Sequence, residues 1–193
     1  ILLIRSVRLC LMSIVIFTLT LMINPQLFDF PSIFGVVKST DGLKRNQTRP
    51  LRAEVQEIGI AKYSGSQLQY IGDKENGRDF YGIVDNLYYE SKGMDGLFQK
   101  RVSYTKEITL KNFQGNNLGL PEKTFDYMFL WDTKNYTVGI CNWDACMKHT
   151  IVKDATVAFR VDYGDITFLA KNVVPIEKQD FSIKLYELIE ELV

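Results

Sequence analysis

The sequence predicts an all-β protein, with a single jelly-roll-like or sandwich domain behind an N-terminal transmembrane helix. Three observations predict this: an uncharged apolar segment near the N-terminus, long stretches in which apolar and polar residues alternate with period 2, and clusters of turn-forming residues between those stretches. The 193-residue length fits one domain with a short appendage. We therefore expect an anchor at 1–24, a linker at 25–52 and a β-rich extracytoplasmic domain at 53–193.

The anchor prediction rests on residues 9–23, LCLMSIVIFTLTLMI, which carry no charge. As a helix they would be roughly 22 Å long, shorter than a hydrocarbon core of about 30 Å. The turn before them adds length, because the side chains of Arg5 and Arg8 can reach the membrane interface. No convincing small-residue cleavage site follows, which favours an uncleaved anchor over a signal peptide, and a buried helix remains an alternative.

The orientation of the anchor follows from charge. Arg5 and Arg8 favour a cytoplasmic N-terminus, whereas basic residues between 38 and 52 argue for the reverse. Because a long domain translocates largely regardless of such charges, we expect a single-pass membrane protein with a cytoplasmic N-terminus and a periplasmic, or extracellular or luminal, domain. The next segment, 25–52, is rich in Pro, Asp, Ser, Thr, Asn and basic residues without an apolar period, which is typical of a linker.

The β prediction follows from alternation along the rest of the chain. Turn-forming sequences such as SKGMDG, GNNLGLPE and DTKN lie between the strands, and the tail at 181–193 has the pattern of a strand that passes into a short helix. The principal strand candidates are DFYGIVDNLYYES (79–91), RVSYTKEITLKNF (101–113), TFDYMFLWD (124–132), NYTVGICN (135–142), ATVAFRVDYG (155–164) and DITFLAKNVV (165–174).

Two of the three cysteines and the only histidine lie in GICNWDACMKH, residues 139–149. Cys141, Cys146 and His149 supply three ligands, whereas a closed structural zinc site needs four, so we predict no metal site. A catalytic Cys–His pair would also need a third, orienting group and a feature that lowers the thiol pKa. We instead predict a hairpin with the loop 142–145, in which Cys141 and Cys146 face each other as a disulfide candidate, Trp143 lies at an exposed tip and His149 is a strand residue.

Composition and motifs exclude other classes of function. Lys+Arg and Asp+Glu are equal at 23 each, so no overall field attracts nucleic acid. The sequence contains no glycine-rich phosphate loop, no G-x-S-x-G and no H-E-x-x-H. We therefore expect a protein that is not an enzyme, with no catalytic residues and no cofactor.

The arrangement of a short membrane helix, a linker and one β-domain resembles the LptC family, the inner-membrane-anchored component of bacterial lipopolysaccharide export. The sequence QYIGDKENGRDFYGIVDNLYYES is similar in form to the first strands of that family. The later FLWDTKNYTVGICNW and IVKDATVAFRVDYGDITF are similar to its paired strands. Cys141, Cys146 and the acidic tail depart from the family, and the tail departs where the family ends in a strand that joins the next β-domain.

The resemblance implies a role in lipopolysaccharide transport. The protein would receive lipid from inner-membrane transporter subunits and pass it to a periplasmic β-domain partner by strand addition. The one-sided strands could line the lipid groove of an open jelly roll, or the same residues could fill a closed core. The groove candidates are Tyr81, Ile83, Leu87, Tyr104, Ile108, Phe125, Tyr127, Phe129, Trp131, Val138, Phe159, Val161 and Phe168.

Two other functions remain open, and neither includes catalysis. The chain could be an extracellular or luminal interaction domain with a type II anchor, in which case the sequons at Asn46 and Asn135 would carry glycans. It could also be an accessory subunit of a membrane protein complex.

Overall fold

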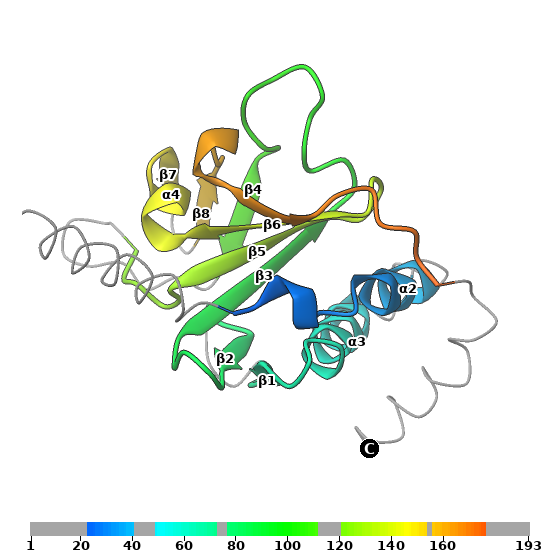
Figure 1. The fold of residues 1–193 in the computed structure, drawn as a ribbon. Coiled ribbons are helices and arrows are strands. Elements are labelled where there is room, and N and C mark those ends of the chain that lie inside the picture. The colour runs from blue at the N-terminus through cyan, green and yellow to red at the C-terminus, as the bar shows by residue number, and fades with distance from the viewer. Residues whose placement is uncertain (1–22, 41–48, 73–76, 112–120, 154–155, 177–193) are drawn as a thin grey trace, which may run out of the picture.

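The computed structural model describes residues 23–40, 49–72, 77–111, 121–153 and 156–176 (Figure 1). Within these residues the chain forms two β-sheets and a few helices, so the prediction of a β-rich domain is confirmed. The elements in chain order are η1 (Pro25–Leu27), α2 (Phe30–Thr40), α3 (Arg49–Lys62), β1 (Leu68–Tyr70), β2 (Phe80–Gly82), β3 (Tyr88–Met94), β4 (Ile108–Lys111), β5 (Tyr127–Asp132), β6 (Thr137–Asn142), α4 (Trp143–Met147), β7 (Thr150–Lys153), β8 (Thr156–Phe159), η2 (Tyr163–Asp165) and β9 (Thr167–Ala170).

The larger sheet has six strands in the order β1-β2-β3-β5-β6-β9, and the smaller has three in the order β4-β8-β7. Neighbouring strands are antiparallel except β3 and β5, which are parallel. A parallel pair needs a crossover connection, and here the chain adds β4 to the small sheet before it returns as β5.

The larger sheet is the middle one of three layers. Successive side chains of a strand point to opposite faces, so Phe129 and Trp131 of β5 lie in one hydrophobic core, and Met128 and Leu130 lie in the other. All four side chains are at most 2% exposed. Helices α2 and α3 cover the first face, and the small sheet with α4 covers the second (Figure 1).

The predicted linker at 25–52 includes the helix α2, which packs into the core. Ile33 and Phe34 of this helix are fully buried against the larger sheet. The carboxylate of Asp29 accepts a hydrogen bond from the backbone N–H three residues further on, at 3.1 Å, and so caps the helix. Pro31 lies in the first turn, where the helix needs no N–H donor. It therefore helps to begin a helix.

The predicted strand 79–91 is divided into β2 and β3 by a tight turn. The carboxylate of Asp85 accepts hydrogen bonds from the backbone N–H of Leu87, at 3.1 Å, and from the hydroxyl of Tyr89, at 2.5 Å. Asn86 adopts a positive φ of 60°, which Asn tolerates better than most residues. The turn places the apolar residues before Asp85 at an exposed hairpin tip.

Asp132, at the end of β5, joins two loops through a fully buried carboxylate. Its Oδ1 accepts hydrogen bonds from the backbone N–H groups of Gly96 (2.9 Å), Lys134 (3.1 Å) and Asn135 (3.0 Å). Its Oδ2 accepts from the backbone N–H of Phe98 (3.1 Å) and from the Asn135 amide (2.9 Å). The turn between β5 and β6 is thus fixed to the loop that follows β3.

Several predicted features lie outside the described residues. They include the predicted anchor except its last two residues, Ile23 and Asn24, as well as the sequon at Asn46 and the tail at 181–193. Among the helices that the structure describes, none combines the length and the apolar character needed to cross a bilayer.

Candidate functional site

The segment that holds the cysteines and the histidine is a strand followed by a short helix, so the predicted hairpin is wrong. Cys141 is in β6 and Cys146 is in α4, while β7 pairs with β8 and not with β6. The side chain of Asn142 accepts a hydrogen bond from the backbone N–H of Ala145 at 2.9 Å and caps α4. Asn142 therefore starts a helix where the sequence predicts a hairpin loop.

The two thiols nevertheless meet. Cys141 and Cys146 are free cysteines, 2% and 0% exposed, and their sulfur atoms lie 3.4 Å apart. The hydrogen bond with Cys141 and burial both raise the pKa of the Cys146 thiol, so this group stays protonated and is a poor nucleophile. The geometry does not favour thiol catalysis. A disulfide would need the sulfur atoms to approach to about 2.05 Å. Because both thiols are free in this structure, the predicted bridge stays a prediction.

His149 lies in the turn after α4 and not in a strand, and its side chain is 52% exposed. Its Nε2 is 3.0 Å from a carboxylate oxygen of Asp162. Lys148 pairs with the same carboxylate at 2.9 Å and with Asp165 at 3.0 Å. These hydrogen bonds, first from Lys148 and then from His149, lower the pKa of Asp162. The group is an exposed ion cluster of the kind that contributes little to stability.

The described residues contain no group of three or more His, Cys, Asp or Glu side chains that could hold a metal ion. Trp143, which we predicted at an exposed tip, packs its ring against Phe125 with centroids 4.8 Å apart. The thiols and the tryptophan thus belong to the same hydrophobic core, whereas the histidine lies apart in the exposed ion cluster.

The groove candidates are divided between the two faces of the larger sheet. On the helix side, Phe129, Trp131 and Val138 are at most 2% exposed, with Leu87 and Tyr127 partly buried beside them. On the other side, Ile108, Phe125, Phe159 and Val161 are equally buried, with Phe168 against them. Tyr81 and Tyr104 are half-buried, and Ile83 is 52% exposed. The fully buried members fill two cores on opposite faces of the sheet, which corresponds to the closed-core alternative for these residues.

Glu90 and Lys92 of β3 form an ion pair in which the Glu90 side chain is only 4% exposed. Burial lowers the pKa of the Lys92 ammonium, but the carboxylates of Glu90 and Asp79 raise it more, so the net shift is upward. A general base or an amine nucleophile needs the opposite shift. The upward shift of its pKa therefore does not favour a catalytic role for this lysine.

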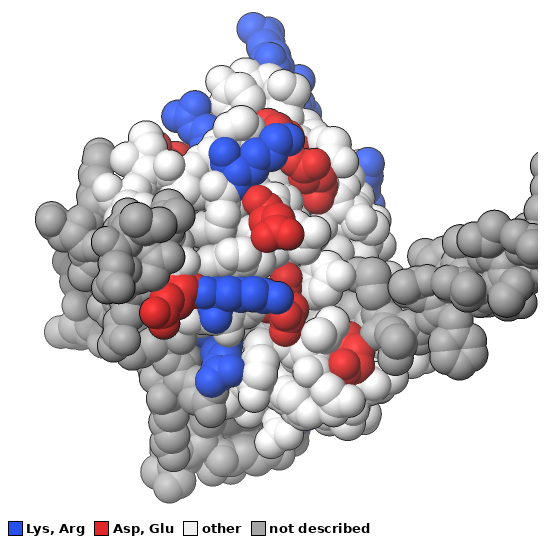
Figure 2. Space-filling view, turned by 90° about the vertical axis from the view of Figure 1, so that its left-hand side faces the viewer, with Lys and Arg blue, Asp and Glu red and all other residues white. Residues whose placement is uncertain are grey.

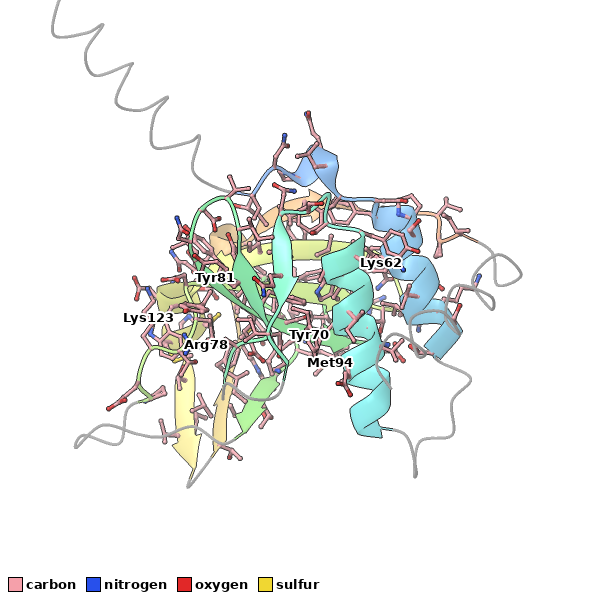
Figure 3. All side chains as sticks on the ribbon, turned by 90° about the horizontal axis from the view of Figure 1, so that it is seen from below. Lys62, Tyr70, Arg78, Tyr81, Met94 and Lys123 are labelled. Atoms are coloured by element: carbon pink, nitrogen blue, oxygen red, sulfur yellow. The ribbon has the colours of Figure 1, made fainter. Side chains whose placement is uncertain are left out.

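An aromatic cluster lies beside this pair. The guanidinium of Arg78 is 4.0 Å from the ring centroid of Tyr88, which is 5.5 Å from that of Tyr81. Figure 3 shows Arg78 and Tyr81 on the same side of the molecule as Lys123, which pairs with Asp126 at 2.6 Å. Each of these groups has an intramolecular partner, so we assign the cluster a structural role.

The charge distribution agrees with the balanced composition. On the face shown in Figure 2, acidic and basic side chains are intermixed, and uncharged surface lies between the groups of charges. The described residues of this face form no broad basic area of the kind that binds nucleic acid.

The strongest surface feature is the edge strand β7. It pairs with β8 on one side, and it is the last strand of the small sheet. Ile151 and Val152 are 58% and 38% exposed, although consecutive residues of a strand point to opposite faces. We did not predict this surface from the sequence, because we expected the residues of β7 to pair with those of β6 in a hairpin. The signal was present in TIVK, where β-branched residues lie next to one another without alternation.

The comparisons add no family. No protein-family model matches the sequence, and a search of curated proteins finds no match.

Proposed function

We propose that this protein is a membrane-tethered, extracytoplasmic interaction domain without catalysis, which docks a β-strand of a partner protein on β7. The observation that carries this proposal is the edge of β7, which pairs with no second strand among the described residues, together with its exposed Ile151 and Val152. The membrane tether rests on the apolar segment 9–23 of the sequence.

An edge strand presents a row of backbone N–H and C=O groups that can pair with another strand. Proteins usually protect such edges with charges, proline or bulges. Here two adjacent apolar side chains are exposed on an edge strand in regular register with β8. In strand addition the backbone groups supply affinity and the alternate side chains supply specificity, so Ile151 and Val152 would contact the partner from the two faces of the sheet.

A photoreactive side chain at position 152 tests this proposal in the native cells. We expect a covalent adduct with a discrete protein, and the substitution Ile151→Lys should remove it by placing a charge in the interface. The matched control is position 174, since Val174 is 81% exposed but lies outside the strands. An equal adduct at position 174, or none at position 152, would contradict the proposal.

Lipopolysaccharide transport is the second candidate. The resemblance to the LptC family and the open edge of β7 both favour it, because that family passes lipid to a β-domain partner added at a sheet edge. The burial of Phe129 and Phe159 in two different cores is the reason for placing it second. Photoreactive groups at these two positions discriminate between the candidates: an adduct with lipopolysaccharide supports lipid transport, and its absence in folded protein supports the interaction domain alone.

A further inference from the structure

We infer that the surface formed by Leu27, Ile83 and Val84, here called the apolar end, rests in the interface of the bilayer that anchors the chain. This inference rests on the membrane tether of the proposed function and adds the orientation of the domain. The three side chains are 55%, 52% and 57% exposed. Together they make up half of the large hydrophobic side chains that are exposed in the described chain.

The apolar end lies beside the point where the predicted anchor segment joins the domain. Ile23, the last residue of the predicted span, is 4% exposed and belongs to the helix-side core. The next residue, Asn24, is held by the side chain of Gln67: its backbone N–H donates to Oε1 at 2.5 Å, and its carbonyl accepts from Nε2 at 2.9 Å. The chain is therefore fixed to the domain directly after the apolar segment, with no slack between them.

Contacts bring the three segments of the apolar end together. A Cβ added to Gly65 would lie 2.6 Å from the carbonyl oxygen of Leu27, so these two segments touch. The backbone N–H of Ile83 donates to the carbonyl of Gln67 at 2.9 Å. Gln67 thus links the first residues of the domain to the β2–β3 hairpin tip.

The composition of this surface fits a membrane interface. The residues at 24–27, 65–67 and 82–86 include one charged side chain, Asp85, which is half-buried and bonded to the hydroxyl of Tyr89. The others are apolar or are uncharged residues such as Asn24, Gln26 and Ser66. A bilayer interface accepts apolar and uncharged polar side chains readily. The hydrocarbon core below it strongly disfavours charged groups.

The occupant follows from the junction. A short, fixed connection keeps this surface close to the lipid whenever the apolar residues before Ile23 are in the bilayer. A soluble partner would have to enter between the domain and the membrane. Lipid is therefore the occupant to which the proposal commits.

Fluorescence quenching in vesicles tests this proposal on the full chain. The variant Cys10→Ser, Val84→Cys is labelled with bimane and reconstituted in phosphatidylcholine and phosphatidylglycerol vesicles that contain a brominated phosphatidylcholine. Cys141 and Cys146 are buried and should not react in the folded protein. The matched control is Cys10→Ser, Ile151→Cys, because Ile151 is an exposed β-branched residue of similar exposure, 58%, on a distant strand.

We expect brominated lipid to quench bimane at position 84 at least twofold more than at position 151, and aqueous iodide to show the reverse order. Equal quenching by brominated lipid at both positions would overturn the inference. Protection from iodide at position 84 without quenching by lipid would also overturn it, since a protein would then cover the surface. Flotation of the chain with vesicles is measured in the same samples: floating protein with unquenched position 84 removes this inference alone, and protein that does not float removes the tether as well.

Discussion

Replacing Asp132 by Asn should strongly destabilise the domain, although the two side chains are nearly the same size. The buried Asp132 carboxylate accepts hydrogen bonds from three donors at Oδ1 and two at Oδ2, at 2.9 to 3.1 Å. An amide has one acceptor oxygen and one NH₂ donor. If the amide oxygen takes the Oδ1 position, the NH₂ group faces the N–H of Phe98 and the amide of Asn135.

The magnitude follows from those two donors. A buried donor that loses its acceptor costs about 1 to 3 kcal/mol, and because these two donors are only part-buried, the expected decrease in the free energy of unfolding is about 2 to 4 kcal/mol. The other orientation of the amide would oppose the three donors at Oδ1 and cost more. A loss of this size is a large part of the roughly 5 to 15 kcal/mol that stabilises an ordinary domain.

Urea unfolding followed by the fluorescence of Trp131 and Trp143 measures this loss, with the midpoint and the slope fitted separately. The matched control is Asp165→Asn, which removes a surface ion pair with Lys148 and should change the free energy of unfolding by less than about 1 kcal/mol. A decrease of less than about 1 kcal/mol for Asp132→Asn as well would refute the reasoning, because the five hydrogen bonds would then not depend on a carboxylate.

Two further predictions concern the segment 139–149 and its contacts. Maleimide labelling of denatured, unreduced protein should modify one of the three cysteines, because Cys141 and Cys146 become bridged in an oxidising compartment, and labelling of all three would disprove the bridge. By the chain-entropy relation such a short loop should add only about 2 kcal/mol of stability. The carboxyl of Asp162 should titrate below its ordinary pKa in an NMR experiment, so its ion pair with Lys148 is present at neutral pH and is lost as the pH falls through that lowered value. Lys148→Ala should raise this pKa, and an unchanged pKa would show that the ion pair is not formed in solution.

The sequence was a good guide to the β content of this chain, because alternation is a local property. It could not assign the faces of the strands. The run from 127 to 132 in β5 is buried on both sides, so its alternating residues lie in two different cores. Period 2 indicates which side chains share a face, but the element that covers that face is a property of the whole fold. This is why the groove candidates, chosen as one set, are divided between two cores.

The helices were missed for a related reason. The apolar run in α2 is short, and Asp29 and Pro31 are frequent in turns as well as in the first turn of a helix. Short helices are marginal without tertiary packing, and this helix is stabilised by the sheet against which it packs. Asn142 presents the same ambiguity, because its side chain can close a turn or cap a helix.

The helix α2 also changes what the predicted tether can do. A linker over 25–52 would let the domain move freely above the membrane, whereas the fixed junction at Asn24 would orient it. Figure 3 shows η1 at the top of the view and β7, in yellow, at the bottom, so the apolar end and the docking edge lie on opposite sides of the domain. With the apolar end on the lipid, β7 faces away from the membrane. A partner that reaches β7 must then extend beyond this domain, which favours an extracytoplasmic β-domain over the membrane-embedded part of a neighbouring subunit.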